Sequence, residues 1–130
     1  MIVTTLDSDC ANIFEDILVR TTEALKEESK KTPEHFSSLS SDDFEIKVKD
    51  ALEDHSLKTK FEGSFQRVSG QRFPDIISKQ RCGFGVEVKK VSSDKWETIG
   101  NSIMEGNRVE NITSIYLFFG KLADPIDFKF

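Results

Sequence analysis

The stretch Phe84-Gly-Val-Glu-Val-Lys-Lys-Val91 predicts a strand with one packed face and one charged face. Because successive side chains on a strand point to opposite faces, its central valines lie on the packed face, and Glu87 and Lys89 project together from the other. A second strand is predicted over 73–78, and a short polar turn joins the two strands as a hairpin. Pairing across that turn places Asp75 beside Glu87.

Helical periodicity precedes this hairpin. Apolar residues recur on one face of residues 10–31, which predicts a first helix. A proline and several serines predict a loop over 32–41. A second helix is predicted over 42–54, with Ser41 or Asp42 available as its N-cap.

The remaining elements complete a mixed pattern. Loose alternation predicts a strand over 57–67, helical spacing predicts a third helix over 94–108, and an apolar run predicts a buried strand over 114–119. The expected order is therefore α-α-β-β-β-α-β. This order predicts the α/β class in its α+β form, with a mixed sheet flanked by helices.

The chain of 130 residues has the size of one domain. We expect an N-terminal helix and loop over 1–41, a core over 42–122, and the start of a truncated C-terminal part over 123–130. No apolar run approaches the ~20 residues that a membrane span needs, so no membrane association is expected. Cys10 and Cys82 fit no ligand spacing. Two free thiols in a reducing cytoplasm are therefore expected.

The net charge of −5, taken alone, argues against nucleic-acid binding, because phosphates attract cations. The charges are unevenly spread, however, since residues 58–95 hold nine lysines and arginines but only four carboxylates. Such a basic segment is either a solvated face or a surface for a phosphate backbone. Its position matters here because it contains the hairpin with Asp75, Glu87 and Lys89.

The hairpin residues have a definite chemistry. Two carboxylates ~4 Å apart repel by roughly 1–4 kcal/mol at ordinary effective dielectric, and a divalent cation between them would relieve that repulsion. Hard oxygen ligands of this kind suit Mg²⁺. Such an ion neutralises charge on a phosphate and lowers the pKa of a bound water, while Lys89 can orient that water and stabilise developing negative charge. The residues therefore point to metal-assisted hydrolysis of a phosphodiester.

The spacing of these residues resembles a known motif. Acid-x-Lys triplets are common, and three others occur in this chain, but only Glu87-x-Lys89 lies on an apolar strand that follows the single Pro-Asp pair, Pro74-Asp75. With their flanking runs, Arg72–Ile77 and Gly85–Lys90, these residues resemble the core of the PD-(D/E)XK nucleases. Within that superfamily they are most similar to type II restriction endonucleases. The resemblance covers about residues 42–122.

The resemblance implies a restriction-endonuclease-like core that cleaves double-stranded DNA with Mg²⁺, for which Mn²⁺ can substitute. It implies that Asp75 and Glu87 bind the metal together with the backbone carbonyl of Val88, and that the motif lysine assists the water. The family often adds a carboxylate from the preceding helix, which here is Glu45. Asp42-x-x-Glu45 also has the spacing of a capping box, so a structural role for Glu45 stays open.

The resemblance also bears on partners. Contacts with DNA are expected from the basic segment and the helix after it: Arg67, Arg72, Lys79, Arg81, Lys90, Lys95 and Asn101. Complete restriction enzymes are usually longer, so we expect a homodimer or a missing C-terminal region, acting within a restriction–modification system. Two alternatives stay open. One is a repair or junction-resolving nuclease on the same core, and the other is a non-catalytic DNA-binding or assembly module.

Overall fold

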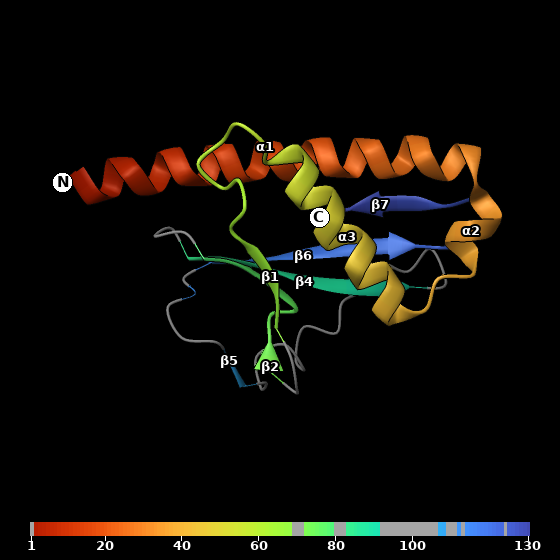
Figure 1. Cartoon of the computed structure of the whole chain (residues 1–130). Helices are drawn as coiled ribbons and strands as arrows, with labels where there is room; N and C mark the ends of the chain where they lie inside the picture. The colour runs from red at the N-terminus through yellow and green to blue at the C-terminus, as the bar shows by residue number, and fades with distance from the viewer. Residues whose placement is uncertain are drawn as a thin grey trace.

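The computed structural model describes residues 2–68, 72–79, 83–91, 107–108, 112, 114–123 and 125–130 (Figure 1). Of residues 2–9, 72–73 and 107–108 it describes the backbone alone. Within these ranges, no helix combines the length and the apolar character that crossing a lipid bilayer requires.

Three helices form the first part of the chain: α1 (Ile2–Lys31), α2 (Pro33–Ser37) and α3 (Ser41–His55). The first predicted helix is confirmed, and it begins earlier, at Ile2. The predicted loop over 32–41 is wrong in part, because α2 lies within it, and its proline occupies an N-terminal position that suits proline's fixed φ.

The N-cap of α3 is Ser40, and not Ser41 or Asp42 as predicted. Ser40 has an extended backbone, and its side-chain oxygen accepts a hydrogen bond from the backbone N–H of Asp43 at 3.0 Å. This is the usual geometry of a serine cap. Glu45 therefore lies outside the capping box that its spacing from Asp42 predicted.

The described residues after α3 form seven strands: β1 (Phe65–Arg67), β2 (Arg72–Phe73), β3 (Ile76–Ser78), β4 (Phe84–Val91), β5 (Asn107–Arg108), β6 (Ser114–Lys121) and β7 (Asp127–Lys129). Five of them form one sheet in the order β1-β3-β4-β6-β7, and β2 pairs with β5. In the larger sheet β4 and β6 are parallel, whereas the other pairs are antiparallel. The predicted mixed sheet of an α+β protein is thus confirmed, and β4 has the predicted bounds.

Two predicted strands are shorter than expected. Residues 57–64 form turns, and the backbone at Lys58 and Gly63 has φ of 69° and 72°. The turn buries Phe61 completely, so an apolar residue points into the core here without belonging to a strand. The strand predicted over 73–78 is interrupted before Ile76. Pro74 has no N–H to donate to a neighbouring strand, and the N–H of Asp75 donates to the Glu87 side chain instead.

Other expectations for the second half of the chain need correction or lie outside the described residues. The predicted helix over 94–108 is wrong at its end, where β5 pairs in parallel with β2, and residues 92–106 lie outside the described ranges. The apolar strand predicted over 114–119 is confirmed and extends to Lys121. Residues 127–129 form an edge strand of the main sheet.

Cys10 takes part in a disulfide, which corrects the expectation of a free thiol. A disulfide needs two Cα atoms within about 7 Å, and such proximity is not visible in isolated cysteines of a sequence. The other cysteine of the chain, Cys82, lies outside the described residues.

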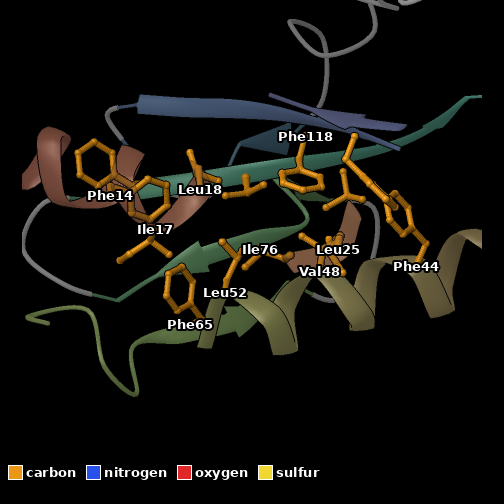
Figure 2. Close-up of a cluster of buried hydrophobic side chains, with 14 of the residues drawn as sticks. Phe14, Ile17, Leu18, Leu25, Phe44, Val48, Leu52, Phe65, Ile76 and Phe118 are labelled. Atoms are coloured by element: carbon orange, nitrogen blue, oxygen red, sulfur yellow. The ribbon is translucent and has the colours of Figure 1, made fainter. Parts of the chain in front are cut away.

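The core lies between the helices and one face of the main sheet. Side chains that are fully buried come from α1, α3 and the strands, and Figure 2 shows them packed against one another: Ile17, Leu18, Val48, Ile76 and Phe118. Burial of each such side chain is worth about 1.5–3 kcal/mol relative to exposure. In Figure 1, α3 crosses the strands while α1 runs along them, and both helices contact the sheet.

Gly120 in β6 sets how closely α3 approaches the sheet. Phe44 of α3 is fully buried, and a Cβ atom on Gly120 would lie 2.2 Å from Phe44 Cζ. The phenyl ring therefore occupies the space that any side chain at position 120 would fill. Because Glu45 is the next residue of α3, this contact also brings the Glu45 carboxylate to the edge of the sheet.

Candidate active site

The structure places Asp75 beside Glu87, as the hairpin predicted. The register of β3 and β4 pairs Ile76 with Val86, so Asp75 lies at the level of Glu87 on the neighbouring strand. The backbone N–H of Asp75 donates to Glu87 Oε1 at 3.1 Å, and the N–H of Val88 donates to Asp75 Oδ2 at 2.9 Å. Each carboxylate is thereby held by the main chain of the other's segment.

Lys89 completes the predicted triad of side chains. Its Nζ lies 3.2 Å from Glu87 Oε2, and the two side chains are only 24% and 10% exposed. They lie two residues apart on β4 and share a face, opposite the valines that pack toward the helices. Glu87 therefore accepts from the Asp75 backbone with one oxygen and pairs with the Lys89 ammonium through the other.

Burial makes the Asp75 carboxyl hard to ionise. Desolvation is the largest cause of a rise in its pKa from 3.8 to about 7, and the negative charges of Glu87 and Glu45 add to that rise. The hydrogen bond from Val88 and the charge of Lys89 act in the opposite direction. Strongly perturbed carboxyl groups of this kind concentrate at functional sites.

Glu45 of α3 contacts the end of β1 through Arg67. Its side chain is 17% exposed, and its Oε1 accepts hydrogen bonds from Arg67 Nε at 3.0 Å and Arg67 Nη2 at 2.8 Å. The negative charge of Glu45 is one of the smaller causes that raise the pKa of Asp75. Because Ser40 caps the helix and Glu45 binds Arg67, the capping role predicted as an alternative for Glu45 is wrong.

Gly85 leaves room for Pro74, the residue before Asp75, to pack against β4. A Cβ atom on Gly85 would lie 2.3 Å from Pro74 Cγ, so the proline ring rests directly on the backbone of β4. This close contact positions Asp75 one residue further along, opposite Glu87. No role was predicted from the sequence for Gly85 beyond its place in the Gly85–Lys90 run. A glycine within a strand is nevertheless a signal that another part of the backbone approaches closely.

The predicted DNA-contacting residues are in different situations. Arg67 is engaged by carboxylates, Lys90 donates from Nζ to the backbone carbonyl of Leu39 at 2.8 Å, and Lys79 is exposed. For Arg72 the structure describes the backbone but not the side chain. The remaining predicted contacts lie outside the described residues: Arg81, Lys95 and Asn101.

A divalent cation fits the carboxylate pair. Within the described residues, no group of three or more His, Cys, Asp and Glu side chains is arranged as a ready metal cage. Mg²⁺ does not need one, because it keeps several waters and is usually held through one or two carboxylates. Asp75 and Glu87, with the backbone carbonyl of Val88 between Glu87 and Lys89, supply oxygen ligands of that type. The desolvated Asp75 carboxyl is also the kind of group that a cation would stabilise in its charged form.

A separate cavity of about 220 Å³ lies between α1 and α3, and it shares no residue with this site. Polar side chains from both helices line it, among them Glu28, Lys47, Asp50 and His55. Lys47 and Glu28 form an ion pair there at 2.5 Å. The cavity therefore reflects the polar seam between two packed helices and adds nothing to the carboxylate pair.

Comparison with known proteins does not assign the chain to a family. No family model matches it, and no curated protein or solved structure matches it either. The fold and the site thus define an α+β protein in which the carboxylate of Asp75, just before β3, lies beside the carboxylate of Glu87, and Glu87 pairs with Lys89 on β4.

Proposed function

We propose that this protein is a metal-dependent endonuclease that hydrolyses phosphodiester bonds of double-stranded DNA, as type II restriction endonucleases do. One observation carries the proposal: Asp75, just before β3, meets Glu87 and Lys89 of the neighbouring strand β4, with mutual contacts and little exposure. The resemblance of Pro74-Asp75 and Glu87-x-Lys89 to the nuclease motif supports the same reaction.

The energetics favour a functional over a purely structural reading of the carboxylate pair. A solvated cross-strand ion pair would leave its carboxylates in water, yet Glu87 is buried and the pKa of Asp75 is raised to about 7 by desolvation first. Burying a charge is costly unless it is paired or binds a metal. Lys89 carries one positive charge and pairs with Glu87. When both carboxyl groups are ionised, one negative charge of the Asp75–Glu87 pair is therefore not neutralised by Lys89.

Each side chain has a role in the proposed reaction. Asp75 and Glu87 would hold the cation, with the carbonyl of Val88 as a further ligand. When bound, Mg²⁺ neutralises charge on the scissile phosphate and lowers the pKa of a coordinated water. Lys89, held by Glu87, stabilises the negative charge that develops on the phosphate oxygens, and Glu45 accepts a hydrogen bond from the attacking water.

A digest of supercoiled plasmid with Mg²⁺ tests the proposal. The wild-type protein is compared with Asp75→Asn and with Asp16→Asn, a control that neutralises an exposed carboxylate of α1. Cleavage into discrete fragments that only Asp75→Asn abolishes supports a restriction-type enzyme. Cutting of branched or damaged DNA alone would favour the repair or junction-resolving alternative. Binding of DNA without cleavage by the wild type would overturn catalysis and leave a DNA-binding module.

A further inference from the structure

Arg67 links the edge of the sheet to the helix that carries Glu45. It is the last residue of β1, and its register partner on β3 is Ile76, next to Asp75. From there its guanidinium reaches α3, where Nε and Nη2 both donate to Glu45 Oε1. Nη2 also lies 3.3 Å from Asp42 Oδ1.

The exposure of the partners shows which contact matters more. The Asp42 side chain is 82% exposed, so its ion pair with Arg67 competes with water. Exposed pairs of this kind contribute little. Glu45 is 17% exposed and receives two hydrogen bonds from one guanidinium. Such charge-assisted contacts fix direction as well as distance, because the guanidinium donors form a rigid fork.

We propose that Arg67 is a positioning residue, which holds the Glu45 carboxylate toward the Asp75–Glu87 pair. This inference rests on the proposed function and extends it by one residue outside the motif. Both guanidinium contacts go to Oε1, so Oε2 of Glu45 is left unoccupied by the arginine and can face the cation or its water. Arg67 therefore acts on the reaction through Glu45 and not through a DNA phosphate.

The alternative role, a direct phosphate contact, competes with this geometry. The guanidinium donates Nε and Nη2 to Glu45, which is largely buried and has Arg67 as its ion-pair partner within the described residues, so a phosphate could take these two donors only by breaking that pair. A buried carboxylate left without its partner is costly. The structure thus separates Arg67 from the exposed Lys79, whose side chain is available to solvent.

Replacement of Arg67 by lysine tests this role at constant charge. Lysine keeps the positive charge but lacks the planar fork, so a purely electrostatic role would survive the change and a positioning role would not. Arg67→Lys is made in the wild-type and the Glu45→Gln backgrounds. Arg20→Lys is the matched control, because Arg20 forms an exposed pair with Asp16 on α1 at 2.7 Å. The readouts are the Kd for Mn²⁺ by calorimetry, kcat and KM for plasmid cleavage, and the melting temperature.

We expect Arg67→Lys to weaken Mn²⁺ binding and lower kcat by ~10-fold or more, the scale for losing a residue that orients a metal site. The KM for DNA and the melting temperature should stay close to the wild-type values. In the Glu45→Gln background the same change should alter neither Mn²⁺ binding nor kcat further, because residues that act as a unit are non-additive. Arg20→Lys should match the wild type throughout.

Three results would overturn the inference alone. One is a wild-type protein that binds Mn²⁺ and cleaves DNA while Arg67→Lys does both equally well. The second is an equal loss from Arg67→Lys in both backgrounds, which would show that Arg67 does not act through Glu45. The third is a rise in KM at constant kcat, which would place Arg67 on the DNA. A wild-type protein that neither binds Mn²⁺ nor cleaves DNA would overturn the proposed function, and this inference with it.

Discussion

The backbone N–H of Asp75 donates to the Glu87 carboxylate at 3.1 Å, while the Asp75 carboxylate accepts from the N–H that follows Glu87 in the chain, at 2.9 Å. Each of the two side chains therefore reaches across to the backbone of the segment that carries the other. Main-chain groups are less mobile than side chains, so this arrangement fixes the spacing of the carboxylates before any ligand binds. Preorganisation of this kind is what a metal-binding pair requires.

Replacement of Asp75 by asparagine should weaken Mn²⁺ binding by at least ~10-fold, the lower range for damage to a metal site. Asparagine keeps the size of the side chain and can still accept the hydrogen bond from Val88, but it removes the charge. Isothermal titration calorimetry measures the effect, with Asp16→Asn as the control. Equal Mn²⁺ affinities in Asp75→Asn and the wild type would remove the metal site.

Replacement of Lys89 by methionine should leave Mn²⁺ and DNA affinity largely unchanged while kcat falls ~100-fold, the usual effect of losing one electrostatic stabiliser. Methionine keeps the apolar stem. Lys49→Met is the control, since Lys49 is 26% exposed and pairs with Glu53, much as Lys89 pairs with Glu87. The comparison uses plasmid cleavage rates at saturating DNA. Cleavage by Lys89→Met at the wild-type rate would take the lysine out of the mechanism.

The stability of the metal-free protein should decrease as pH rises from about 4 to 7, through the Asp75 carboxyl. Its pKa is about 7 in the folded state and near 3.8 when unfolded, chiefly because of desolvation. The native state thus binds the proton more tightly, and its contribution to stability is present below the unfolded pKa and lost through the folded one. Asp75→Asn cannot ionise and should gain stability relative to the wild type over this range.

Urea denaturation in EDTA at pH 4.5 and pH 8 measures that difference. Other carboxyl groups titrate in both proteins, so their effects cancel when the wild type is compared with Asp75→Asn at each pH. A stability difference that is the same at both pH values would show that Asp75 titrates normally.

Replacement of Gly85 by alanine should destabilise the protein by about 1–3 kcal/mol, the cost of inserting a methyl group into packed space, and should also impair metal binding. The new Cβ would overlap Pro74, and moving the proline displaces Asp75 from Glu87. Gly63→Ala is the control. It strains an exposed turn with φ of 72° but meets no atom within 4 Å. It should lose stability and keep Mn²⁺ affinity, whereas Gly85→Ala with full Mn²⁺ affinity would contradict the role of this contact.

Local patterns in the sequence determined the central hairpin. The bounds of β4 follow from its alternation, and the shared face of Glu87 and Lys89 follows from a period of two, which any strand imposes. The position of Asp75 beside Glu87 follows from the few residues that separate their antiparallel segments in the sequence. These features depend on residues close in the chain, so no knowledge of long-range packing was needed to predict them.

Predictions from local patterns were wrong where a side chain contacts residues distant in the sequence. Phe61 is buried although it lies in a turn, so its apolar character wrongly indicated a strand. Ser40 is the N-cap of α3, although Ser41 and Asp42 are residue types equally suited to that position. Asp42-x-x-Glu45 matched a capping box, yet Glu45 lies 22 positions before the arginine that binds it. Propensity and spacing are weak constraints, and tertiary contacts override them.

The sequence by itself therefore determined which residues carry the candidate chemistry, because strand periodicity and a short separation in the sequence are enough to bring Asp75, Glu87 and Lys89 together. Only the tertiary structure decided what surrounds them. The contact of Phe44 with Gly120 spans 76 positions, and it brings Glu45 to the sheet where Arg67 can hold it. Such contacts arise from the packing of a helix against a sheet, and their partners leave no periodic signal in the chain.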